Sequence, residues 1–237
     1  MAKTLKTLVM MPTYNEVSGL RASVGRLLEL NPTVDVLIID DNSPDGTGKL
    51  ADQLASDQRV HVLHRAGKQG LGKAYMAGYS WGIERGYDKL VQMDADGSHR
   101  PEDLANLLTT EADLVIGSRW ISGGAVENWP KYRQLISQLG NRYASFTTGI
   151  ELGDLTAGYR AYKSSALKSL DLNRLEAQGY GFQIEMTRRV VARGLSVTEV
   201  PIRFVERENG RSKMTYAIIL EAFWLCTKWG FARLTKR

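Results

Sequence analysis

Two aspartates separated by one alanine, Asp94 and Asp96, follow the apolar run 90–93 and precede the polar turn 97–99. If the extended backbone continues through them, both carboxylates point to the same side, because side chains alternate along a strand. Two oxygen ligands on one side suit Mg²⁺ or Mn²⁺, which usually arrives with substrate phosphates. The same acids also fit a helix N-cap and a turn, because residues 101–103 have the composition of a helix start. The spacing alone leaves both interpretations open.

A second acidic segment, residues 40–47, follows another apolar run and has the sequence DDNSPDGT. Its acids are placed to accept hydrogen bonds from a base or a ribose, as an acid near the second strand does in dinucleotide-binding folds. The segment is also a turn signal followed by an N-cap candidate, Thr47. Phosphotransfer receiver domains also open with a strand that ends in two aspartates, but they are much shorter and lack a later Asp-x-Asp.

Basic residues form two groups that suit phosphate. Arg119 follows an apolar run, and Arg133 lies beyond a segment rich in Gly and Trp, residues 119–130, that is typical of a mobile loop. Paired guanidinium groups recognise phosphate in a bidentate way, although a solvated surface arginine is the ordinary alternative for each. The second group, residues 207–213, either closes over a diphosphate or faces anionic lipid.

The three histidines show no metal-ligand spacing. His61 and His64 lie in or beside a predicted strand, and we interpret them as structural. His99 follows the acid pair in the same turn, and the sequence leaves its role open.

Apolar runs alternate with helical patterns through the first half of the chain. Strands are predicted at 7–11, 34–39, 60–63, 89–93 and 114–116, with helices at 20–30, 47–56, 72–84 and 102–109. This alternation predicts an α/β fold with a largely parallel, doubly wound sheet and a ligand at the carboxyl ends of the strands. Polar segments follow four of these strands, at 12–16, 40–43, 94–96 and 117–119, so we expect them to share one edge. Farther on, helices are predicted at 132–147 and 181–193 and a strand at 196–204.

Composition narrows the class of protein. At 237 residues, with 43% hydrophobic and 24% charged residues, the chain can bury a sizeable core as one large domain or two small ones. A net charge of +5 favours anionic partners such as phosphates, nucleic acid or a membrane surface. The single cysteine, Cys226, excludes a disulfide scaffold and a thiolate metal site. The first twelve residues predict a strand and not a signal peptide, so we expect an intracellular protein.

The apolar stretch 214–232 near the end of the chain is broken by Glu221 and Lys228. A membrane-spanning helix needs roughly 20 apolar residues with few charges, so two charges argue against one. We expect a helix that lies in the membrane interface, with Trp224 and other aromatic residues inserted among the lipids. The alternative is a terminal helix packed on the sheet or in a dimer contact.

In this order, the segments resemble those of family 2 glycosyltransferases, and most closely the dolichol- and polyprenol-phosphate mannosyltransferases within that family. The matching segments are 12–16, 39–47, 94–99, 117–119, 154–160 and 201–213. The resemblance implies a GT-A (Rossmann-like) fold with a largely parallel central sheet flanked by helices, and a metal-dependent inverting enzyme. We expect a catalytic domain over residues 1–212 and, from the charges and aromatic residues of the tail, an amphipathic membrane-interface helix over 213–237. The implied reaction transfers mannose from GDP-mannose to a polyprenyl monophosphate, with Mg²⁺ or Mn²⁺ as cofactor.

The resemblance also assigns site residues by position. It assigns to the nucleotide-sugar Pro12, Tyr14, Glu16, Ile39, Asp41, Asp94, Ala95, Asp96, Arg207 and Lys213. It assigns to the acceptor phosphate Arg119, Arg133 and Ser137. It assigns the metal to Asp94 and Asp96. Ser98 stands where many members carry Gln, and because its side chain is a shorter ligand, we expect water to complete the coordination. The groups taken as catalytic are Asp94, Asp96, Arg119 and Arg133.

Partners and rival functions follow from the same resemblance. Many members have transmembrane helices after the catalytic domain, and this sequence stops short of them. We therefore expect peripheral contact on the cytoplasmic face of a membrane. That contact would come from the tail or from a separate integral membrane partner, and nucleic acid is not an expected partner. One alternative is a glucosyl- or N-acetylhexosaminyl-transferase that uses a UDP-sugar. The other is a non-catalytic nucleotide-binding subunit of a membrane complex.

Overall fold

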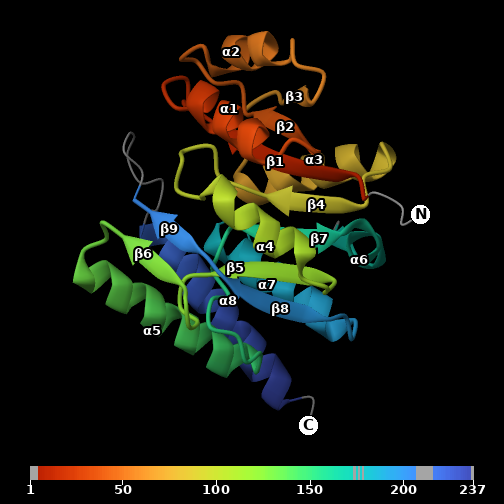
Figure 1. Cartoon of the computed structure of the whole chain (residues 1–237). Helices are drawn as coiled ribbons and strands as arrows, with labels where there is room; N and C mark the ends of the chain where they lie inside the picture. The colour runs from red at the N-terminus through yellow and green to blue at the C-terminus, as the bar shows by residue number, and fades with distance from the viewer. Residues whose placement is uncertain (1–4, 173–174, 176, 178, 207–215, 236–237) are drawn as a thin grey trace.

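A seven-stranded sheet organises the computed structural model, which describes residues 5–172, 175, 177, 179–206 and 216–235. Along the sheet the strand order is β3-β2-β1-β4-β7-β5-β8, and β7 alone runs antiparallel to its neighbours. The predicted largely parallel sheet is therefore confirmed (Figure 1). Its strands are β1 Thr7–Thr13, β2 Val34–Asp40, β3 Val60–His64, β4 Lys89–Gln92, β5 Leu114–Ser118, β7 Arg160–Lys163 and β8 Val197–Pro201.

Helices cover both faces of this sheet, and the central strand β1 shows why. Its residues Leu8 and Met10 point into one core cluster, while Val9 and Met11 point into the other. A parallel strand buried on both faces is apolar throughout, as this one is. One face is covered by α1 (Leu20–Leu30), α2 (Thr47–Leu54), the 3₁₀ turn η1 (Pro101–Asp103) and α4 (Leu104–Thr109). The other face is covered by α3 (Leu71–Glu84), α6 (Ser164–Ser169) and α7 (Tyr180–Ala192) (Figure 1).

The carboxyl ends of β1, β2, β4 and β5 lie at the same edge of the sheet because these four strands are mutually parallel. This confirms that the four polar segments share one edge. One local expectation is wrong: β4 ends at Gln92, so Asp94 and Asp96 lie in a turn beyond the strand and not on extended backbone. Their common orientation must therefore come from the turn itself.

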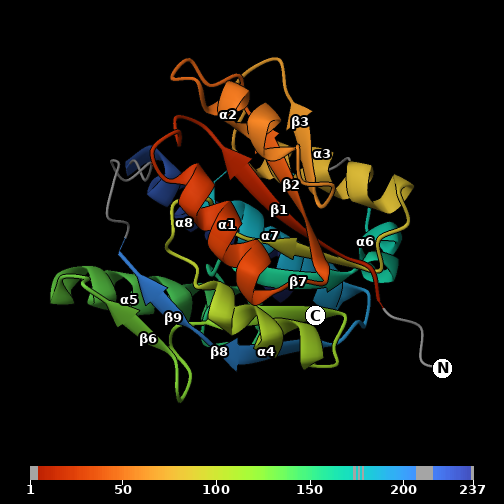
Figure 2. The same ribbon diagram turned by 45° about the horizontal axis from the view of Figure 1, so that its top comes forward.

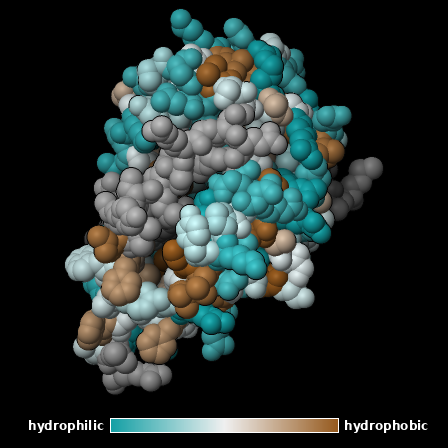
Figure 3. Space-filling view, turned by 90° about the vertical axis from the view of Figure 1, so that its left-hand side faces the viewer, coloured by the Kyte–Doolittle hydropathy of each residue, from teal (hydrophilic) through white to brown (hydrophobic). Residues whose placement is uncertain are grey.

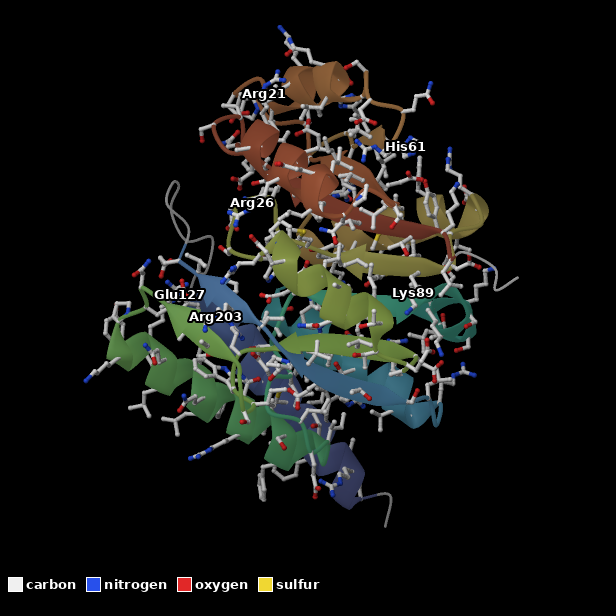
Figure 4. All side chains as sticks on the ribbon, viewed as in Figure 1. Arg21, Arg26, His61, Lys89, Glu127 and Arg203 are labelled. Carbon is white, nitrogen blue, oxygen red and sulfur yellow. The ribbon has the colours of Figure 1, made fainter. Side chains whose placement is uncertain are left out.

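A small second sheet was not expected. The segment 119–130, predicted to be a loop, contains β6 (Ala125–Glu127), which pairs in parallel with β9 (Arg203–Val205). The strand predicted at 196–204 is instead two strands, because the chain passes at Ile202 from β8 in the main sheet to β9 in the small one. Arg203 also pairs with Glu127 at 3.2 Å across this sheet (Figure 4).

Two long helices, α5 (Lys131–Thr148) and α8 (Tyr216–Leu234), lie side by side near the small sheet (Figures 1 and 2). Tyr143 of α5 stacks on Phe223 of α8 at 4.6 Å between ring centres, and its hydroxyl hydrogen-bonds Thr227 at 2.6 Å. Leu225 and Trp229 of α8 are buried in the core. The C-terminal helix therefore packs on the protein along one face. No helix among the described residues is both long and apolar enough to cross a membrane.

Candidate active site

Three hydrogen bonds hold the turn that carries the acid pair. The backbone N–H of Asp94 donates to His99 Nδ1 at 2.9 Å, and the backbone carbonyl of Ala95 accepts from the Ser23 hydroxyl of α1 at 2.9 Å. The carboxylate of Asp96 accepts from the backbone N–H of Ser98 at 3.1 Å. Each of the three residues thus has one fixed point, while the Asp94 side chain stays 36% exposed.

The Asp94 carboxylate lies 3.9 Å from Nδ1 of the buried His99. Asp94 and Asp96 both act electrostatically on His99, where they oppose the burial that lowers its pKa. Among the described residues, no group of three His, Cys, Asp or Glu side chains is placed to hold a metal. Two partly exposed carboxylates without a third side-chain ligand fit a hard cation that brings the remaining ligands with it, as Mg²⁺ or Mn²⁺ does on a diphosphate.

Ser98, the third predicted metal ligand, is buried to 1% exposure. The structure gives its backbone two roles: the N–H binds Asp96, and the carbonyl accepts from the Val205 N–H at 3.1 Å. Coordination by its hydroxyl stays a prediction.

The predicted nucleoside residues after β1 are joined to the segment after β2. The backbone N–H of Glu16 donates to the Thr47 hydroxyl at 2.9 Å, and that of Asn15 to the Ser43 hydroxyl at 3.1 Å. Tyr14 is partly exposed beside the likewise partly exposed Pro12, and the Lys68 ammonium group lies 4.4 Å from the Tyr14 ring centre. These bonds present the two segments as one polar surface at the edge of the sheet.

Asp41 and Ile39, also predicted to line a nucleoside pocket, are both buried. Asp41 forms an ion pair with Arg65, a residue that the sequence analysis missed although it directly follows β3. Burial raises the pKa of Asp41, and the arginine opposes that rise. Ile39 has no exposed surface. Its Cδ1 atom packs against Gly78 of α3, where an added Cβ would lie 2.7 Å from that atom. The Ile39 side chain therefore belongs to the core, and only its backbone is left for a ligand.

Arg119 is held in a buried ion pair that the sequence did not reveal. Its Nε and Nη2 atoms each donate to the Asp154 carboxylate at 2.7 Å, and Nη2 also donates to the Thr156 hydroxyl at 3.0 Å. Asn141 of α5 donates to the same carboxylate at 3.2 Å. Asp154 has no exposed surface, and a buried carboxylate needs such partners to remain charged.

Arg133 lies near Arg119, as expected, and Trp129 connects the two. The Arg133 guanidinium is 4.0 Å from the Trp129 ring centre, and that of Arg119 is 5.6 Å from the same centre. Arg133 also pairs with Glu206, a contact whose two ends are both partly exposed. Ser137 follows one helical turn after Arg133 on α5 and is partly buried.

Two indole rings, those of Trp120 and Trp129, lie beside these arginines. Among the described residues, the buried indole N–H groups of Trp120 and Trp129 have no hydrogen-bond acceptor. The Arg119 guanidinium lies 5.5 Å from the Phe204 ring centre, and the His99 ring lies 5.4 Å from the same centre, so the arginine side comes close to the acid turn. Arg207 and Lys213, predicted to close over the donor phosphates, lie outside the described residues, as does the predicted boundary at 212–213.

Comparison with known proteins identifies the family of the chain. The family model for glycosyl transferase family 2 matches residues 8–171. The undecaprenyl-phosphate mannosyltransferase of Micrococcus luteus is 53% identical over 231 residues, covering 96% of this chain and 95% of that protein. The polyprenol monophosphomannose synthase of Mycolicibacterium smegmatis is 51% identical over 232 residues, covering 96% and 88%. The chain therefore belongs to glycosyl transferase family 2.

Solved structures show the same fold at low identity. Glucosyl-3-phosphoglycerate synthase from Mycobacterium tuberculosis, with Mn²⁺, UDP-glucose and phosphoglyceric acid, has a TM-score of 0.73 at 19% identity, covering 96% of this chain and 80% of that one. A mannosyltransferase from Pyrobaculum calidifontis, with GDP-Man and Mn²⁺, has a TM-score of 0.59 at 15% identity, covering 99% and 75%. The fold is GT-A, as the sequence predicted.

Proposed function

We propose that this protein transfers mannose from GDP-mannose to a polyprenyl monophosphate, with inversion at the sugar's anomeric carbon. The observation that carries the proposal is the closeness of the acid turn and the arginines at the carboxyl edge of a GT-A sheet: His99 and Arg119 both contact the Phe204 ring, and Arg119 and Arg133 both contact the Trp129 ring. The names of relatives with 53% and 51% identity support the acceptor and the sugar. A GDP-Man complex in a protein of the same fold agrees with the donor.

On the donor side, Asp94 and Asp96 would hold Mg²⁺ or Mn²⁺ against the diphosphate. The cation, when bound, neutralises the charge that develops on the departing diphosphate. The turn beneath it contributes rigidity, because Ser23, Ser98 and His99 fix its backbone and the Asp96 carboxylate. Tyr14, Glu16 and Asp41 would face the nucleoside from the linked segments after β1 and β2.

On the acceptor side, Arg133 and Ser137 would hold the phosphate at the start of α5. A phosphate monoester loses its second proton with a pKa of about 6, so near neutral pH its oxygen attacks without help from a base. This agrees with the state of His99, whose Nδ1 already accepts a hydrogen bond. Arg119 would contribute mainly by fixing the loop around Trp129, because Asp154 already holds its guanidinium group. Direct attack from the far side of the anomeric carbon inverts its configuration.

A membrane surface would supply the lipid acceptor. The large apolar side chains of α5, between 52% and 82% exposed, are Tyr132, Leu135, Ile136, Leu139 and Phe146. Their spacing places them on one face, opposite the buried Asn141 and Ala144. The adjacent α8 exposes Leu220, Phe223, Trp224 and Phe231. Apolar surface gathers in the lower half of Figure 3, where α5 faces the viewer.

These two helices would lie against the cytoplasmic face of a membrane, with Arg133 close to the lipid headgroups. That placement follows the proposed reaction, because the nucleotide-sugar is soluble and the acceptor is not. A separate integral membrane protein covering the same surface is the competing explanation for its exposure.

Transfer of labelled sugar into lipid tests the proposal. Purified protein with Mn²⁺, radiolabelled GDP-mannose and polyprenyl phosphate is expected to move label into organic solvent, and NMR of the product is expected to show the inverted anomer. UDP-glucose and UDP-N-acetylglucosamine, tested in parallel, are expected to give none. Transfer from a UDP-sugar alone would replace the proposed donor, and nucleotide binding without transfer from any donor would indicate a non-catalytic subunit.

A further inference from the structure

The side chain of His99 contacts the backbone of Asp94. The Asp94 N–H donates to Nδ1 at 2.9 Å, so Nδ1 carries no proton and the neutral ring bears its proton on Nε2. The contact between Nδ1 and the Asp94 carboxylate, at 3.9 Å, is therefore not an ion pair.

The ring itself has little room to move. It stacks on Tyr159 at 4.8 Å between ring centres, and the edge of Phe204 contacts it at 5.4 Å. Gly158 lies so close that a Cβ at that position would stand 3.4 Å from the His99 Cε1 atom. Close packing of this kind fixes the ring orientation and hence the direction of Nδ1.

The backbone beside His99 is attached to the acceptor side of the site. His99 forms a bridge with Phe204 of β9, and the Val205 N–H donates to the Ser98 carbonyl at 3.1 Å. One residue farther along, Glu206 pairs with Arg133. The end of β9 and the residue after it therefore border both the acid turn and Arg133.

We propose that His99 is a positioning residue for the acid pair: its Nδ1 holds the backbone of Asp94 so that both carboxylates face one cation. This inference rests on the proposed function, because it assumes a cation at that site. A buried amide needs an acceptor, and losing it leaves the N–H unsatisfied or lets the turn relax. Ser23 and Ser98 hold Ala95 and Asp96, so removing the Nδ1 acceptor of His99 acts first on the backbone of Asp94.

Two substitutions separate the acceptor from the ring. His99→Phe keeps a ring but removes Nδ1, whereas His99→Asn keeps an acceptor at the same distance from the backbone but removes the ring. We expect His99→Phe to weaken Mn²⁺ binding about tenfold and His99→Asn to weaken it less than about threefold. Binding is measured by the electron paramagnetic resonance signal of free Mn²⁺, with GDP present and again with UDP. The matched control is His61→Phe, at a partly exposed histidine of β3 well away from the acid turn (Figure 4).

Each outcome decides the matter. If His99→Phe binds Mn²⁺ like the wild type, or if His99→Asn is the weaker variant, the ring acts only by packing and the inference is wrong. If His99→Phe does not fold, as judged by thermal unfolding, His99→Ala replaces it, and equal Mn²⁺ binding by His99→Ala and His99→Asn overturns the inference. If the wild type and Asp94→Ala both fail to bind Mn²⁺ with either nucleotide, the proposed metal site fails and the inference falls with it.

Discussion

The acid turn and the arginine region lie at the same edge of the sheet but are built in opposite ways. Asp94 and Asp96 are fixed through backbone groups and stay partly exposed, so a cation can approach them. Each arginine instead already holds a carboxylate: Arg119 holds the buried Asp154, and Arg133 holds the partly exposed Glu206. The proposed donor side is therefore accessible, while on the proposed acceptor side an incoming phosphate would have to share or displace a carboxylate.

The two ion pairs, Arg119 with Asp154 and Arg133 with Glu206, also differ from each other. Arg119 is 7% exposed and Asp154 is fully buried, whereas the side chains of Arg133 and Glu206 are 21% and 27% exposed. A buried pair cannot lose one member without leaving an isolated charge, whereas an exposed pair is easily replaced by water or another anion. We therefore assign Arg119 a mainly structural part and Arg133 the larger part in binding.

The largest expected effect comes from the proposed donor side. Asp96→Ala should lower mannose transfer by at least about a thousandfold, because it removes a carboxylate that holds the cation at the leaving group. The measurement is labelled mannose in organic solvent, with circular dichroism to show that the fold is retained. Glu29→Ala, an exposed acid near the end of α1, is the matched control and should transfer normally. Full activity of Asp96→Ala contradicts the metal assignment.

The next largest effect is expected on protein stability, when the buried ion pair between Arg119 and Asp154 is broken. Asp154→Ala should lower the free energy of unfolding by about 3–5 kcal/mol, because Arg119 is left buried without its carboxylate. Glu206→Ala, the control at the exposed pair, should lower it by less than about 1 kcal/mol. Urea unfolding measures both values. Equal effects from the two variants would remove the distinction drawn between the arginines.

The acceptor side is also the side attached to the proposed membrane face, since α5 carries Arg133 at its start. The double variant Leu135→Glu with Leu139→Glu should weaken co-sedimentation with anionic vesicles by at least about tenfold, because it removes two apolar side chains from that face. Gln138→Glu adds a charge at an exposed polar position of the same helix and should have little effect. Vesicle binding that is insensitive to all of these changes argues that a protein partner covers the helix.

The smallest effect is expected at the partly exposed ion pair between Arg133 and Glu206. Glu206→Gln should lower the KM for polyprenyl phosphate about two- to fivefold, because Arg133 loses an exposed competitor worth about 0.5–1 kcal/mol. Steady-state kinetics at saturating donor measure this change, and the KM for GDP-mannose serves as the internal control. A higher KM for the acceptor would mean that Glu206 orients Arg133 instead of competing for it.

Much of the fold could be predicted because the parallel strands are strongly apolar. β1, β2, β4 and β5 were found from their composition, and their polar ends indicated the edge where ligands bind. β7 could not be found in this way, since it has four residues and begins with Arg160, which is fully buried. That guanidinium group is satisfied by the backbone carbonyls of Leu155, Ala157 and Gln183. No local pattern indicates such a set of partners.

In the site, too, local sequence features could be predicted and distant partners could not. Residue type and spacing drew attention to the acid pair and the two arginines, and the family resemblance assigned their roles, but their partners were not predicted. Asp154 lies 35 residues from Arg119, and Glu206 lies 73 residues from Arg133. The three-residue strand β6 is too short to show a period, so the small sheet that brings Glu206 to Arg133 was missed as well. Long-range pairs of this kind depend on topology, which the sequence pattern does not give.

The most direct test is the position of a bound cation. A crystal grown with Mn²⁺, GDP and a short polyprenyl phosphate should show an anomalous manganese peak between the carboxylates of Asp94 and Asp96, with the acceptor phosphate on Arg133. Manganese elsewhere in the molecule, or a lipid phosphate remote from Arg133 while GDP occupies the edge of the sheet, would contradict the account.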